Sequence, residues 1–171
     1  MKNTILFIAI AFSGSTGLAF AEEKMTMPMD HSAHMSKPAQ IAISDAAKDA
    51  VATVDRFSAA LAAGNLEAVG AELDPNVLVL ESGNAEHSAA EYLASHAKGD
   101  AAFLKTVHVQ LMRRSAQASG DMAWVASESE MHVQMDGKRI TLLSTETMVL
   151  KRNGKTWKII HIHWSSRTKK A

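Results

Sequence analysis

The residues with the clearest capacity for chemistry lie near the end of the chain, in the segment Trp157-Lys158-Ile159-Ile160-His161-Ile162-His163-Trp164-Ser165. Side chains of a β-strand point alternately to opposite faces, so His161 and His163 are predicted to share one face and Ile162 and Trp164 the other. Two imidazoles in an otherwise apolar strand need hydrogen-bonding partners if they are buried. This pair is therefore the first candidate for a functional site.

The preceding segment offers a carboxylate as a partner for these histidines. Asn153-Gly154 is a strong signal for a two-residue hairpin loop, and this loop predicts that Arg152 faces Lys155. The same register predicts two further facing pairs, Glu146 with His161 and Ser144 with His163. The catalytic candidates are thus Glu146, His161 and His163.

A polar island extends this cluster onto a third strand. Asp136-Gly137 predicts a second hairpin with Met135 opposite Lys138. One sheet face then carries an apolar wall around six polar residues, an arrangement typical of a ligand pocket. The predicted island consists of Ser127, Ser129, Ser144, Glu146, His161 and His163. Three interpretations remain open: a buried pair that fixes strand register, a small-molecule pocket, or a metal site. A β-bulge would move the residues beyond it to the opposite face.

The chain begins with the layout of a secretory signal peptide. Lys2 precedes an apolar run over residues 5–12, and Ala19-Phe20-Ala21 forms a typical cleavage motif. We expect residues 1–21 to be removed before Glu22, which gives a periplasmic or secreted protein without a membrane anchor. Since the chain has no cysteine, its folded core must stabilise it without disulfides.

The charges are balanced, with 18 basic and 18 acidic residues in the full chain. Removal of Lys2 leaves 17 basic residues against 18 acidic ones, a net charge of −1. This balance gives no electrostatic reason to expect nucleic acid or an anionic membrane as a partner. Residues 168–171 are predicted to be a short, solvated basic tail.

A methionine- and histidine-containing segment precedes the domain. Residues 22–41 predict a flexible linker, because they hold two prolines and no aromatic residue. Thioether and imidazole groups suit Cu(I), and six such residues fall within eleven positions. They are Met25, Met27, Met29, His31, His34 and Met35. The open interpretations are a polar tether and a weak copper site that forms only when the ion binds.

Residues 42–167 predict one α+β domain. Ser44 can cap a first helix that ends at Gly64, and its apolar positions recur at helical spacing. Asn65 can cap a second helix, and residues 77–80 predict a strand. Ser88 opens a third helix running to about residue 98. The runs 105–118, 122–135, 138–152 and 155–165 predict four strands joined by hairpin signals, and hence an antiparallel meander covered on one face by the helices.

This order resembles the nuclear transport factor 2-like superfamily, which includes ketosteroid isomerase and the SnoaL-like polyketide cyclases. Segments over residues 44–167 are similar to small exported SnoaL-like bacterial proteins. They are Val79-Leu80-Glu81-Ser82-Gly83, Ala123-Trp124-Val125, Thr145-Glu146-Thr147-Met148-Val149-Leu150 and residues 157–167. The resemblance implies a cone-shaped fold with N-terminal helices packed on a curved, mostly antiparallel sheet. The tyrosine and paired aspartates of the steroid isomerases have no match here, since the only tyrosine, Tyr92, lies on the third predicted helix.

The resemblance also implies that the third helix borders a pocket, which adds Tyr92 and His96 to the candidate lining residues. We expect an exported protein that binds a small ligand in its cone, with copper binding by the N-terminal segment. The alternatives are an acid–base enzyme of cyclase or isomerase type and a structural or assembly domain. A homodimer is expected through Ile160, Ile162 and Trp164, which share the predicted outer face.

Overall fold

The computed structural model describes residues 38–135 and 137–170, so the predicted signal peptide and the six Met and His residues of the N-terminal segment lie outside it. The elements, in chain order, are β1 (Gln40–Ile43), the 3-10 turn η1 (Asp45–Ala47), α1 (Lys48–Ala63), α2 (Leu66–Glu72), β2 (Leu73–Glu81), β3 (Asn84–Glu86), α3 (Ala89–Ala94), α4 (His96–Leu104), β4 (His108–Ser119), β5 (Met122–Met135), β6 (Lys138–Asn153) and β7 (Thr156–Thr168). Within the described residues, no helix is both long and apolar enough to cross a membrane.

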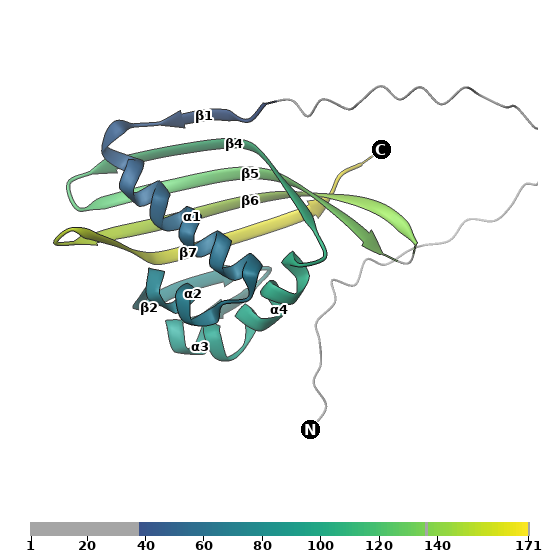
Figure 1. The fold of residues 1–171 in the computed structure, drawn as a ribbon, viewed down its shortest axis with the longest axis horizontal. Coiled ribbons are helices and arrows are strands. Elements are labelled where there is room, and N and C mark those ends of the chain that lie inside the picture. The colour runs from purple at the N-terminus through teal and green to yellow at the C-terminus, as the bar shows by residue number, and fades with distance from the viewer. Residues whose placement is uncertain (1–37, 136, 171) are drawn as a thin grey trace, which may run out of the picture. The chain divides into compact units, whose positions relative to one another are not determined.

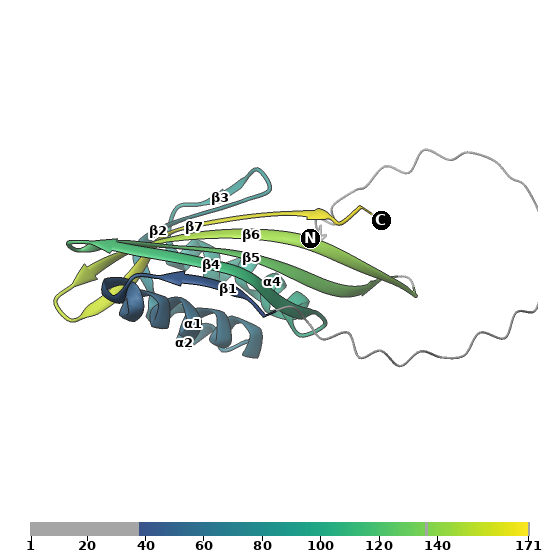
Figure 2. The same ribbon diagram turned by 90° about the horizontal axis from the view of Figure 1, so that it is seen from above.

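All seven strands form one sheet in the order β1-β4-β5-β6-β7-β2-β3. The meander β4 to β7 is antiparallel, whereas β1 pairs with β4 and β2 pairs with β7 in parallel. Helix α1 lies across one face of the sheet, and α2 packs beside it (Figures 1 and 2). The predicted α+β class and four-strand meander are confirmed.

Local sequence signals account for the helix ends. Gly64 ends α1 in the left-handed conformation at φ 73°, which glycine adopts without steric cost. The Asn65 side chain accepts a hydrogen bond from the Ala68 backbone N–H at the start of α2. Ser88 caps α3 in the same way through the Glu91 N–H. The predicted third helix is in fact two helices, because the chain bends at Ser95 between α3 and α4.

Two short strands, β1 and β3, were not predicted, and β2 is longer than expected. It begins at Leu73 and passes through Pro75. The pairing of β2 with β7 is irregular between Leu73 and Leu78, so Pro75 lies where its missing N–H breaks no regular ladder. These differences depend on pairing partners that are distant in sequence.

The predicted register of β5 and β6 is confirmed, with Met135 opposite Lys138 and Ser127 opposite Glu146. The predicted register of β6 and β7 is wrong. The turn residues are Gly154 and Lys155, and Gly154 has φ 63°. A positive φ at the first of two turn residues is typical of a type II′ turn, which needs glycine there.

A β-bulge then shifts the pairing of β6 and β7 further. Val149 lies opposite His161, whereas Leu150 lies opposite Ile159, so Ile160 has no partner of its own. One extra residue reverses the face of every later side chain relative to the partner strand. As a result Glu146 lies opposite Trp164 rather than His161.

Because of the same bulge, the predicted dimer interface is also wrong. Ile162 is fully buried, and Trp164 packs against the core formed between α1 and the sheet. Phe57 of α1 lies over Trp164 with ring centroids 6.3 Å apart. Since Ile162 and Trp164 stabilise the monomer, they are not available to contact a second chain.

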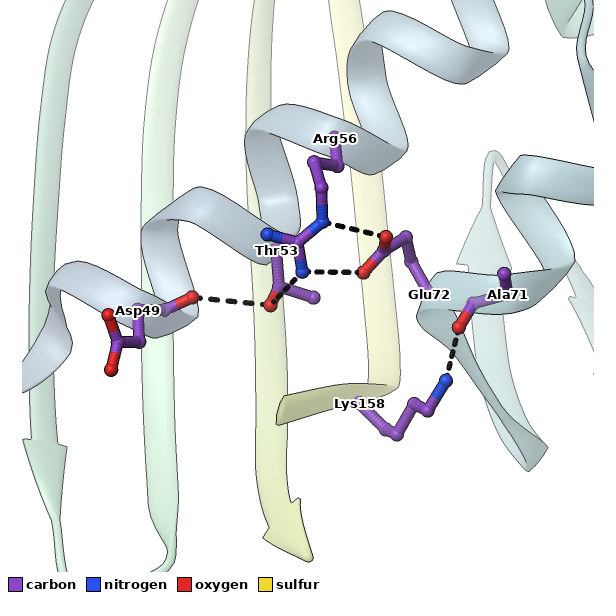
Figure 3. A network of polar contacts seen from close by, with 6 residues as sticks. All are labelled: Asp49, Thr53, Arg56, Ala71, Glu72 and Lys158. Carbon is purple, nitrogen blue, oxygen red and sulfur yellow. Dashed lines mark hydrogen bonds and ion pairs between the residues drawn. The ribbon is translucent and has the colours of Figure 1, made fainter. Parts of the chain in front are cut away.

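A polar network fastens α1 and α2 to β7 (Figure 3). Arg56 donates to both carboxylate oxygens of Glu72 over 2.8 and 2.9 Å, and also to the Thr53 hydroxyl. Lys158 donates to the backbone carbonyl of Ala71. A surface groove of about 450 Å³ lies beside this network. These contacts hold the helices in place over the sheet.

Candidate functional site

A row of side chains crosses the helix-covered face of the sheet, one from each of five adjacent strands. Each lies directly opposite the next: Arg114 on β4, Ser127 on β5, Glu146 on β6, Trp164 on β7 and Glu81 on β2. We call these five residues the cross-strand row. Directly opposed side chains on one face have Cβ atoms about 4.5–5.5 Å apart, so the row forms one continuous strip.

Hydrogen bonds connect four members of the row. Arg114 Nε donates to Ser127 Oγ over 3.1 Å, and Ser127 Oγ donates to Glu146 Oε1 over 3.3 Å. Trp164 Nε1 donates to the other oxygen, Glu146 Oε2, over 2.8 Å. Asp55 of α1 pairs with the Arg114 guanidinium at the end of this chain. Because both oxygens of Glu146 accept hydrogen bonds, this carboxylate is placed to position Trp164.

The Trp164 indole contacts aromatic rings from two helices. Phe57 of α1 stacks with it, and Tyr92 of α3 lies with its ring centroid 6.1 Å away. Aromatic contacts of this kind contribute about 0.5–1.5 kcal/mol each beyond the area they bury. Together with the bond to Glu146, they fix the indole within the row.

Beyond Trp164 the row ends in a group of acidic residues. The Tyr92 hydroxyl donates to Asp100 Oδ2 over 2.8 Å. Burial, together with the nearby charge of Asp100, raises the pKa of Glu81 to about 7. Burial also raises the pKa of Asp100, although its hydrogen bond from Tyr92 and the charge of His96 partly oppose this rise. Burial and the same carboxylates raise the pKa of Tyr92, so the phenol keeps its proton.

This combination gives Glu81 the properties of a proton donor or acceptor. A carboxyl group whose pKa lies near 7 is present in both forms around neutral pH, which is the optimum for general acid–base chemistry. Glu81 and Asp100 are only partly buried, so both carboxyl groups remain in contact with solvent. Perturbed carboxyl groups of this kind often mark functional sites.

The structure places five predicted site residues on the helix-covered side. Ser127 and Ser144 are buried and Tyr92 fully so, whereas Glu146 and Ser129 are half-buried. Ser129 lies opposite Ser144. Ser127 lies opposite Glu146, as in the predicted register, whereas Glu146 meets Trp164 instead of a histidine.

The other three predicted site residues are histidines, and of these only His96 lies near the row, where its charge acts on Asp100. His161 and His163 point to the opposite sheet face, because the bulge at Ile160 reverses their orientation. The His161 Nδ1 lies 2.9 Å from the Leu78 carbonyl oxygen, and His163 is exposed. His96, at the start of α4, forms an ion pair with the buried Glu86, and its side chain is 48% exposed. The proposed pairing of Glu146 with His161 is therefore wrong.

The sequence also contained signals for residues that were missed. Glu81 alternates with Val77 and Val79, both of which are buried, so strand periodicity would have put Glu81 on the core face. Trp164, in contrast, was assigned to the wrong face because the bulge was not visible. The two-residue turn Gly120-Asp121 sets Ser119 opposite Met122, and the same register sets Arg114 opposite Ser127, so the hairpin signal could have found this pairing.

Metal binding at the predicted cluster has no geometric support. Across the described part of the chain, no group of three or more His, Asp or Glu side chains is arranged to hold a metal ion. The cross-strand row contains two carboxylates, but one is hydrogen-bonded to Trp164 and Ser127.

Comparison with known proteins agrees with this architecture. The SnoaL-like domain family matches residues 50–168. The chain belongs to the SnoaL-like domain family. A solved structure from Shewanella frigidimarina, provisionally named a ketosteroid isomerase, is 34% identical with a TM-score of 0.68, and the match covers 72% of this chain and 100% of that one. No curated protein matches the chain.

Two more distant structures share the fold of this SnoaL-like domain. A nuclear transport factor 2-like protein of unknown function from Pseudomonas putida is 17% identical with a TM-score of 0.58, covering 70% of this chain and 85% of that one. The hub of the calcium/calmodulin-dependent protein kinase II of S. rosetta is 23% identical with a TM-score of 0.58, and the match covers 70% of this chain and 95% of that one. The fold therefore occurs in proteins with very different roles.

Proposed function

We propose that this SnoaL-like domain is exported and binds a small organic molecule at the Trp164–Glu81 end of the cross-strand row. One observation carries the proposal: a half-buried carboxyl group, Glu81, lies directly opposite the Trp164 indole, beside Asp100 and Tyr92. An aromatic surface with a few convergent polar groups suits a ligand that is mainly apolar. A protonated Glu81 can donate a hydrogen bond, so we infer a ligand with a carbonyl or hydroxyl group.

A second candidate function is acid–base catalysis on such a ligand. It is favoured by the pKa of about 7 for Glu81, which allows this carboxyl group to accept a proton from carbon and return it elsewhere. The isomerase-type name of the Shewanella frigidimarina protein is consistent with this chemistry. In this proposal Glu81 replaces Glu146 and the two histidines as the proton-transfer group.

Native mass spectrometry of the protein purified from its own cell envelope tests the binding proposal. We expect a chain that begins at Glu22 and carries a non-covalent small molecule. Glu81→Leu should reduce ligand occupancy several-fold, because an aliphatic side chain cannot donate a hydrogen bond to the ligand. Glu128→Leu is the matched control, since Glu128 is exposed on the opposite sheet face. Equal occupancy in both variants would place the ligand elsewhere.

The same measurement counts the subunits. We propose a homodimer formed through the sheet face opposite α1, which none of the described helices covers, in the region around Trp124. This side chain is 38% exposed, which is unusual for a large aromatic residue, and burial in an interface would stabilise it. Related folds named hub or association domains support a search for assembly. A monomeric mass would contradict this part of the proposal.

We also propose that the N-terminal segment with Met25, Met27 and Met29 binds Cu(I). Replacing its methionines with leucine and its two histidines with asparagine, in the mature chain, should abolish most Cu(I) binding in a competition titration. Met122→Leu is the control, because Met122 is an exposed methionine of the folded domain. An unchanged copper stoichiometry in the substituted segment would refute the proposal.

A further inference from the structure

Two histidines form a cross-strand pair at a distance from the row. His108 near the start of β4 lies directly opposite His132 near the end of β5. Their rings are nearly parallel, with an interplanar angle of 16° and centroids 6.0 Å apart. Val133, the next residue on β5, is buried and shares its face with the core residue Val125. Alternation along the strand therefore places His132, and His108 opposite it, on the face away from α1.

A hydroxyl group on the next strand orients one of these rings. Thr141 on β6 lies directly opposite His132, and its Oγ1 is 3.2 Å from His132 Nδ1. When Nδ1 carries the hydrogen, it donates to this hydroxyl and leaves the Nε2 lone pair free. Histidines that bind metals are typically oriented in this way by a hydrogen bond at the other ring nitrogen.

The pair lies close to the spacing that a single shared ion requires. Metal–imidazole bonds are about 2.0–2.1 Å long, so each ring centroid lies about 3 Å from the ion and two centroids lie about 5 Å apart at a tetrahedral angle. The observed separation of 6.0 Å is longer, so the rings must move toward each other when an ion binds. Side-chain rotation, which is easy for the exposed His108, would bring the two nitrogens closer.

The donors of this pair are the two imidazoles alone. Glu130 shares the face of His132, two residues earlier on β5, but it pairs with Lys169 over 2.7 Å, so its charge is already balanced. Imidazole nitrogens suit a borderline divalent ion.

We propose that His108 and His132 together bind one divalent transition-metal ion of the Zn²⁺, Ni²⁺ or Cu²⁺ class, with water completing its coordination. The site is separate from the cross-strand row, which lies on the other face of the sheet. It also differs from the Cu(I) proposal in ligand type, since it uses imidazole without thioether.

The test uses the mature chain with His31→Asn and His34→Asn in every sample, so that the N-terminal histidines do not contribute. Titration with Zn²⁺ should show one ion per chain, and the NMR signals of both imidazoles should change together at that stoichiometry. Thr141→Val should weaken binding about tenfold through loss of the orienting hydrogen bond. His108→Ala and His132→Ala should each weaken it further.

His163→Asn is the matched control, because His163 is an exposed histidine on the same sheet face. It should leave Zn²⁺ affinity unchanged. The NMR titration needs no substitution of the pair, so it decides the question even if a variant folds poorly. The proposal would be overturned if the two imidazole signals did not change on addition of Zn²⁺, or if they changed at different Zn²⁺ concentrations. An unchanged Zn²⁺ affinity of His108→Ala would overturn it as well.

Discussion

Trp164→Ala is expected to destabilise the domain by about 3 kcal/mol, measured by urea unfolding. Removing a large aromatic side chain from a core costs about 3–5 kcal/mol, and the lower end applies because Trp164 is partly exposed. The substitution removes the ring that contacts Phe57 and Tyr92, and with it the N–H that donates to Glu146. Packing and hydrogen bonding are lost together.

Trp164→Phe separates these two contributions. Phenylalanine retains most of the ring packing but leaves Glu146 Oε2 without its donor, which costs about 1–3 kcal/mol. Trp124→Ala is the control for a tryptophan on the other sheet face, and it should cost less than Trp164→Ala. If the two alanine variants lost equal stability, the position of Trp164 in the core would be wrong. Trp164→Glu should unfold the domain rather than dissociate a dimer.

Glu81→Gln is expected to stabilise the domain above pH 7 and to leave its stability unchanged near pH 4. The pKa of Glu81 rises from 4.5 to about 7 in the folded state, because burial and Asp100 disfavour the charged form. The protonated Glu81 carboxyl therefore makes its full contribution to the free energy of unfolding below pH 4.5, and this contribution is lost as the pH rises through about 7. A glutamine side chain stays neutral at every pH, so the variant does not lose this contribution.

The size of this effect follows from the shift. A change from 4.5 to about 7 corresponds to about 3 kcal/mol at most, and water around this partly exposed group reduces it to about 1–2 kcal/mol. Urea unfolding of both variants between pH 4 and 8 measures this difference in stability. Glu128→Gln is the control, and it should leave the pH dependence of stability unchanged. If Glu81→Gln increased the free energy of unfolding equally at pH 4 and pH 8, the raised pKa of Glu81 would be contradicted.

The amino-acid sequence by itself determined the parts of this domain that depend on neighbouring residues. The caps Asn65 and Ser88, the end of α1 at Gly64, and the register of β5 with β6 all follow from local signals. Alternation along β6 also placed Glu146 on the helix-covered face. Short-range backbone geometry decides these features, so the residues involved are visible together in the sequence.

Only the tertiary structure decided which residues make up the candidate site. The turn at Gly154-Lys155 and the bulge at Ile160 bring Trp164, not a histidine, to Glu146. Hairpin signals allow more than one two-residue turn, and a bulge depends on how the strand bends to pack against α1. The parallel pairing that brings Glu81 to Trp164 joins residues far apart in the chain, and no local pattern specifies it because its stability comes from burying the core between them.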